Sequence, residues 1–145
     1  MDADPANPLL VLIGELAFAI NVQFMTPWAA PVLLASLLVM VVGSLLDPGN
    51  RPPASWKYLL LPFLIPVMLL GAGVVFYWEY WSSDVSAFVL LILWGMLFLQ
   101  APVGIGLIIM MRGRRLFTLG VWILQVWVSF TAFAVAAMSV SGLGP

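Results

Sequence analysis

The sequence predicts an all-α integral membrane protein in which residues 1–145 form a single domain, a bundle of transmembrane helices. Hydrophobic residues make up 64% of the chain, charged residues only 8%, and the mean hydropathy is +1.16. A soluble domain of this size could not cover so much apolar side chain with so few charges. A second observation is the placement of the Lys and Arg residues, all 5 of which lie in the segments 51–57 and 112–115.

The region between these basic segments predicts two membrane-spanning helices, at about 58–78 and 85–111. Two crossings return the chain to the side from which it started, so both basic segments share one face of the bilayer. Because cytoplasmic loops carry the excess of Lys and Arg, we expect the loops 47–57 and 112–115 to be cytoplasmic. The acidic connection at 79–84 then lies on the other face, and we expect the membrane to be a bacterial inner (plasma) membrane.

The apolar run that precedes the first basic segment, residues 9–46, is too long for one straight crossing. A single helix of that length would span about 57 Å at ~1.5 Å per residue, whereas the hydrocarbon core is about 30 Å thick. Asn7-Pro8 and Thr26-Pro27 each supply a helix cap followed by proline, which favours helices at about 8–25 and 27–46 joined by a tight hairpin. This arrangement gives five spans. The alternative is four spans, with residues 8–25 forming an interfacial or re-entrant helix.

The chain after the second basic segment predicts a last span at about 116–140. Small and polar residues recur on one face of this helix, at Thr118, Gln125, Ser129, Ala132 and Ala136. Similar stripes occur in the other apolar segments, at Ala29, Ser36 and Gly43, at Pro62, Pro66 and Gly73, and at Gly95, Pro102 and Gly106. Because helices in lipid associate through close approach at small residues, we expect these stripes to lie at helix–helix interfaces rather than along a pore.

The sequence contains no Cys and no His, and this absence restricts the chemistry available to the protein. Without Cys there are no disulfides, thiolate nucleophiles or Cys-based metal sites. Without His the chain lacks the commonest general base and the commonest metal ligand. The formal net charge of −1 provides no basic field for nucleic acid. We therefore expect no catalytic residues, no metal site, no cofactor and no nucleic-acid partner.

Glu15 is the only charged residue inside a predicted span, which makes it the strongest candidate for a functional residue. An ionised carboxylate at the bilayer centre costs about 2.5–3.5 kcal/mol on insertion scales, so the group needs a proton, water or a partner. Gln23 lies on the same half of the helix, and Gln100 and Gln125 on other spans are candidate hydrogen-bond partners. These residues have two interpretations: a proton- or cation-binding site, or a polar contact between helices or subunits.

The remaining polar and aromatic residues have simpler explanations. Arg112, Arg114 and Arg115 set the topology, and they could also hold anionic lipid headgroups at about 1 kcal/mol each near the surface. Most Trp and Tyr residues lie near the ends of the predicted spans, as in the aromatic belts of membrane proteins. Three tryptophans lie deeper, and we expect them to pack in the core rather than against a pigment, quinone or partner helix: Trp94, Trp122 and Trp127.

Two functions remain compatible with these observations. The first is a non-catalytic, structural or accessory subunit of a larger membrane complex, with the lipid bilayer and other membrane subunits, or further copies of this chain, as partners. The small-residue stripes on several helices favour this function. The second is a small oligomeric proton- or cation-coupled transporter or channel that uses Glu15.

Overall fold

The computed structural model of this chain describes residues 8–46, 57–77 and 83–142, and each element in these ranges is helical. In chain order they are α1 (Pro8–Met25), α2 (Ala29–Leu46), α3 (Lys57–Leu60), the 3-10 turn η1 (Leu61–Phe63), α4 (Leu64–Val75), α5 (Ser83–Met110) and α6 (Arg115–Ser141). The predicted all-α fold class is confirmed, and the predicted helix bounds agree with the observed ones to within a turn.

Four helical stretches in the described part of the chain are long and apolar enough to cross a membrane. They are Ala29–Leu46, Lys57–Val75, Val85–Met110 and Arg115–Ser141. These stretches make the protein a membrane-embedded bundle by length and composition. The predicted count of five spans is not confirmed.

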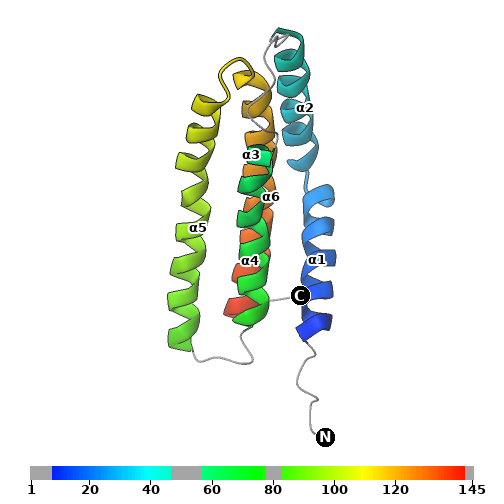
Figure 1. The fold of residues 1–145 in the computed structure, drawn as a ribbon. Coiled ribbons are helices and arrows are strands. Elements are labelled where there is room, and N and C mark those ends of the chain that lie inside the picture. The colour runs from blue at the N-terminus through cyan, green and yellow to red at the C-terminus, as the bar shows by residue number, and fades with distance from the viewer. Residues whose placement is uncertain (1–7, 47–56, 78–82, 143–145) are drawn as a thin grey trace, which may run out of the picture.

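Helix α6 lies at the centre of the bundle, and the other helices pack around it (Figure 1). Half of its spanning window is buried inside the protein, compared with 17–28% for the other three spanning stretches. Its composition explains this position, because its buried residues are mostly small or hydroxyl-bearing: Thr118, Gly120, Ser129, Thr131, Ala132, Ala136 and Ser139. Small side chains let the neighbouring backbones approach closely on several sides at once.

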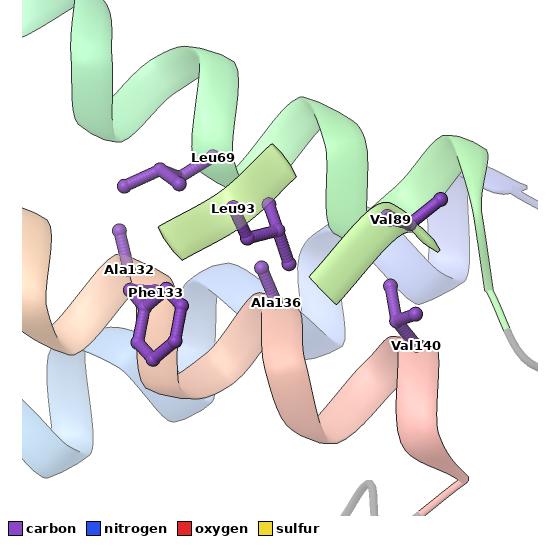
Figure 2. Packing of buried hydrophobic residues seen from close by; sticks show 7 residues of the cluster. All are labelled: Leu69, Val89, Leu93, Ala132, Phe133, Ala136 and Val140. Carbon is purple, nitrogen blue, oxygen red and sulfur yellow. The ribbon is translucent and has the colours of Figure 1, made fainter. Parts of the chain in front are cut away.

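The apolar core joins α4, α5 and α6 in the half of the bundle nearer the end of α6. Its buried residues are Leu69, Val89, Leu93, Ala132, Phe133, Ala136 and Val140 (Figure 2). The ring of Phe133 also lies against Trp94, with ring centroids 4.6 Å apart and an interplanar angle of 56°. Such tilted aromatic pairs are favourable beyond the area that they bury. Trp94 is nonetheless 46% exposed, so it packs at the edge of the core and not within it.

Helices α1 and α2 follow one another in the same direction, antiparallel to α6, and do not form the predicted hairpin (Figure 1). A Cβ atom at Gly43 of α2 would overlap the backbone at the start of α6, whereas Glu15 of α1 interacts with Ser139 near its end. A hairpin would instead have brought Glu15 back to the level of α2. The break between the two helices is a turn in which the Ala29 N–H donates to the Thr26 carbonyl at 2.9 Å. Pro27 has no N–H for a helical hydrogen bond, and this accounts for the interruption.

The prolines of the next crossing also change the helix locally without ending it. Pro62 lies in the 3-10 turn η1, between α3 and α4. Neither Pro62 nor Pro66 has an N–H, so the backbone around them loses two helical hydrogen bonds. The chain compensates by tightening, and the N–H of Leu64 donates to the Leu61 carbonyl three residues back. Pro102 is tolerated inside the continuous helix α5.

Three of the four small-residue stripes lie buried between helices, as predicted. These are the stripe of α6, the α2 stripe of Ala29, Ser36 and Gly43, and the stripe of Pro62, Pro66 and Gly73. The fourth stripe is different. Gly95 and Pro102 of α5 are exposed, and neither Gly95 nor Gly106 has an atom within 4 Å of the position where a Cβ would stand. This face of α5 therefore has no partner among the described residues of the chain.

Candidate functional site

Glu15 is buried where α1 meets α4 and α6, with 3% of its surface exposed. Gly73 of α4 makes room for it, since a Cβ atom added at Gly73 would stand 3.0 Å from Glu15 Oε1 and 2.9 Å from the Ala136 Cα. The carboxylate thus lies in a small space next to Gly73 and close to Ala136. An acidic group in so apolar a position is costly unless it is protonated or paired.

Among the described residues, one hydroxyl group forms the polar environment of this carboxylate. The Ser139 hydroxyl is close enough to interact favourably with Glu15. Neither carboxylate oxygen, however, has a partner within the distances and angles of a hydrogen bond among the described residues. A carboxylate can accept about four hydrogen bonds, so the described residues satisfy little of its capacity.

Sequence reasoning did not identify Ser139, although a signal for it was present. Ser139 lies three residues after Ala136 and seven after Ala132, so it continues the small-residue face of α6 by one more turn. The hydroxyl is buried on that face, with 1% of the residue exposed. Extending the stripe to the end of the helix would have found it.

The structure does not bring Gln100 or Gln125 to Glu15. Gln125 precedes Ser139 on α6 by fourteen residues, which places it ~21 Å away along the helix axis. The Gln100 backbone carbonyl accepts a hydrogen bond from Trp122 Nε1 at 3.2 Å, so Gln100 lies farther still along α6. The side chain of Gln23 lies outside the described part of the structure. The four predicted polar residues therefore do not form one described cluster.

Gln100 and Gln125 are nevertheless buried, with 3% and 1% of their surfaces exposed. Both side-chain polar atoms of Gln100 and the Nε2 atom of Gln125 lack hydrogen-bond partners among the described residues. Unpaired amides inside an apolar bundle are unusual, because each lost hydrogen bond costs about 1–3 kcal/mol. Each of these groups marks a place where a partner or ligand would be stabilising.

The basic end of the bundle is formed by the turn between α5 and α6. Gly113 allows this turn, because its φ of 99° is strained for residues with a side chain. Arg112 and Arg115 are exposed and Arg114 is half-buried, with its carbonyl accepting the Thr118 hydroxyl at 2.9 Å. Exposed guanidinium groups at one end of the bundle are suited to anionic lipid headgroups, which remains a prediction.

The described residues contain no group of three or more His, Cys, Asp or Glu side chains that could hold a metal ion. Their arrangement provides a single buried carboxylate, a nearby hydroxyl and, at a separate level of the bundle, two buried amides. Such groups can bind a proton or make polar contacts between helices.

Fold and site together define a membrane-embedded helical bundle in which Glu15 is the buried acidic residue of the described part of the chain. Comparison with known proteins adds no narrower assignment: no protein-family model, no curated protein and no solved structure matches the chain.

Proposed function

We propose that this protein is a non-catalytic subunit of a larger membrane complex, and that a transmembrane helix of another subunit packs against α5. The observation that carries this proposal is the exposed small-residue stripe of α5. The same kind of stripe is buried in α2, α4 and α6, but Gly95 and Pro102 face outward. Helix α5 thus carries a helix-packing surface that no described residue of the chain uses.

The physics of helix association in lipid supports this proposal. Lipid tails are as apolar as leucine, so apolar area alone does not draw two helices together in a bilayer. Close approach at small residues does, through van der Waals contact and occasional hydrogen bonds. Around Gly95 the helix surface is open, because no atom lies within 4 Å of the Cβ position. A partner helix can therefore approach the α5 backbone there.

A second outward feature lies on α1. Asn21 is exposed, and Gly14 and Ala17 are exposed on the preceding turns. An amide facing hydrocarbon is unfavourable without a hydrogen-bonding partner. Asparagine side chains are known to hydrogen-bond across helices in membranes. This face of α1 supports the same proposal independently of α5.

The test is purification of the tagged chain from its own membrane in mild detergent. We expect the wild type to bring down at least one other membrane protein in a fixed ratio, measured by native mass spectrometry. Gly95→Leu should reduce recovery of that partner about tenfold or more, because a leucine blocks the close approach of helices. The chain itself should fold, since the position is open and leucine is a better helix former than glycine.

Gly71→Leu is the matched control. Gly71 is also an exposed helical glycine with no atom within 4 Å of its Cβ position, but it lies on α4 and outside the α5 stripe. This variant should keep the partner. A preparation that contains only this chain, as a monomer or an oligomer, would contradict the proposal, as would equal recovery of the partner with both variants.

A second candidate function is supported by Glu15. A buried carboxylate with no hydrogen-bond partner among the described residues is suited to taking up and releasing a proton, as in proton-coupled transporters. Under this proposal the protein is a small, oligomeric transporter or channel. Burial between α1, α4 and α6 then requires that α1 move to open the site, because Glu15 is 97% covered in the structure.

Glu15→Gln tests this candidate, because glutamine keeps the size of the side chain and cannot carry the charge. We expect proton flux in proteoliposomes to fall at least tenfold while the thermal midpoint is kept or raised, since a buried group that needs a proton has been replaced by a neutral one. Flux is followed with a pH-sensitive dye trapped in the vesicles. Ser139→Ala, which removes only the neighbouring hydroxyl, is the control and should retain flux. If the wild type carries no flux, or Glu15→Gln carries as much, the transporter function is rejected.

A further inference from the structure

A cavity of about 470 Å³ lies between α2, α5 and α6, at a different level of the bundle from Glu15. Its volume is in the range of sites that bind small organic molecules. The lining is formed by aliphatic and aromatic side chains, with Gln100 and Trp127 as the residues that carry unpaired polar groups. None of the described residues that line it is charged.

The unpaired polar groups at this cavity are hydrogen-bond donors and an acceptor. The Nε2 and Oε1 atoms of Gln100 have no hydrogen-bond partner among the described residues, nor has Nε1 of Trp127. Trp122 also lines the cavity, but its Nε1 already donates to the Gln100 backbone carbonyl. Gly104 accommodates this indole, since a Cβ atom there would overlap the Trp122 ring. In the cavity wall the Trp122 indole is therefore held by a hydrogen bond, whereas the Trp127 N–H has no partner among the described residues.

The cavity opens sideways onto the surface that would face lipid. Phe98, Ala101 and Phe130 line it and are at the same time exposed on the outside of the bundle. Phe98 and Phe130 are 68% and 51% exposed. Gln100 lies near the middle of α5, far from either end of the helix. A molecule that reaches the site must therefore be soluble in the bilayer, and it enters from the hydrocarbon rather than from water.

We propose that this cavity binds an uncharged, lipid-soluble molecule with a flat, conjugated ring that bears two carbonyl groups, of the chemical class of the quinones. Its ring would stack among Trp122, Trp127 and the phenylalanines, where flat aromatic groups gain most. Its carbonyl oxygens would accept hydrogen bonds from the Gln100 amide and the Trp127 indole, both of which are donors. An apolar tail would leave through the open side, between Phe98 and Phe130.

Other membrane molecules match the charge and the hydrogen-bonding groups of the cavity lining less well. A phospholipid headgroup carries charge, and no charged side chain is present in the lining to receive it. An acyl chain would fill the apolar volume but leave the amide and the indole unpaired.

The unpaired polar atoms are covered by neighbouring atoms in the structure, so a ligand contacts them only after the side chain of Gln100 or Trp127 rotates. The hydrogen bonds gained in binding favour this rotation, because those groups have no hydrogen bond to another described residue.

The test compares two probes that differ only in their carbonyl groups: 2-methyl-1,4-naphthoquinone and 2-methylnaphthalene. Binding to the purified chain in phospholipid nanodiscs is measured by equilibrium dialysis, with empty nanodiscs to subtract partition into lipid. We expect saturable binding of one quinone per chain and at least tenfold weaker binding of the hydrocarbon. Gln100→Leu should weaken quinone binding about tenfold, as expected for the loss of one to two hydrogen bonds, and leave the hydrocarbon unchanged.

Three further variants make the result decisive. Gln125→Leu removes another buried amide that does not line the cavity, and it should leave quinone binding unchanged. Trp127→Phe keeps the aromatic ring but removes the N–H, and it should weaken the quinone several-fold. Ala101→Trp should block the mouth and abolish binding; because Ala101 is exposed, this variant tests the site even if Gln100→Leu fails to fold. Unsaturable quinone partition, equal affinity for both probes, or full quinone binding by Ala101→Trp would overturn the proposal.

Discussion

Gly73 determines how closely α4 approaches both α6 and Glu15. The Cβ position of Gly73 is occupied on two sides, by Ala136 of α6 and by the carboxylate of α1. Any other residue would have to displace a backbone, because the Ala136 contact is with its Cα atom. The glycine is therefore required by packing and not by its own backbone conformation, since no positive φ is recorded there.

Replacing this glycine with alanine should destabilise the bundle. We expect Gly73→Ala to lower the free energy of unfolding by about 1–3 kcal/mol, because overpacking a tight contact forces the helices apart. Gly71→Ala, two residues earlier on the same helix, has open space at its Cβ position and should instead stabilise by about 0.5–1 kcal/mol. Thermal unfolding of both variants in one detergent, followed by circular dichroism, measures the difference. Equal midpoints would contradict the close approach of α4 and α6.

Sequence reasoning at this scale identified Glu15 but not its surroundings. A lone charge in an apolar segment is visible in the sequence because it departs from its neighbours in composition. The neighbours in space, Gly73 and Ser139, are far away in the chain, and no local pattern couples them to Glu15. Which glutamine a carboxylate meets depends on how helices are placed along each other, and that is decided by tertiary packing.

At the scale of the helix, proline and composition predicted where elements start and stop but not how they are joined. Thr26-Pro27 correctly marks the end of α1, because proline cannot donate a helical hydrogen bond. The angle at that break is not encoded in the break itself. Packing of α1 against the last turns of α6 fixes it, through contacts such as Glu15 with Ser139. The predicted hairpin was therefore wrong, because the local sequence does not determine the angle between α1 and α2.

The small-residue stripes likewise show that a sequence pattern predicts which face of a helix can pack closely but not which element packs against it. Spacing of seven residues predicted buried faces in α2 and α6, and these faces are buried because several neighbours need close approach to the same central helix. The equivalent pattern in α5 is exposed at Gly95 and Pro102. Helix α5 packs on the core through Val89 and Leu93 instead, which lie on another face. A stripe predicts that a surface can pack closely; it does not say whether its partner belongs to the same chain.

At the scale of the whole molecule, the path of α1 and α2 changes the expected topology. If α1 does not cross the bilayer separately from α2, the chain crosses four times, through α2, through α3–α4, through α5 and through α6. The beginning of α1 then lies at the same end of the bundle as the end of α6 (Figure 1). A hairpin would have placed it at the other end, beside the basic turn between α5 and α6. The two arrangements thus differ in the compartment that the N-terminus faces.

Single cysteines can distinguish these arrangements, because the natural chain has none. We expect Ala6→Cys and Ser141→Cys to react with a membrane-impermeant maleimide from the same side of sealed membranes. Asn50→Cys, in the loop 47–57 between α2 and α3, should react only from the opposite side, and these three substitutions leave every charged residue in place. The expected result follows from the direction of α1 and α2 along α6, together with the rule that places Lys and Arg on one side. Labelling of Ala6→Cys and Asn50→Cys from one common side would instead restore the hairpin and the fifth span, since only a second crossing by α1 could bring both positions to one compartment.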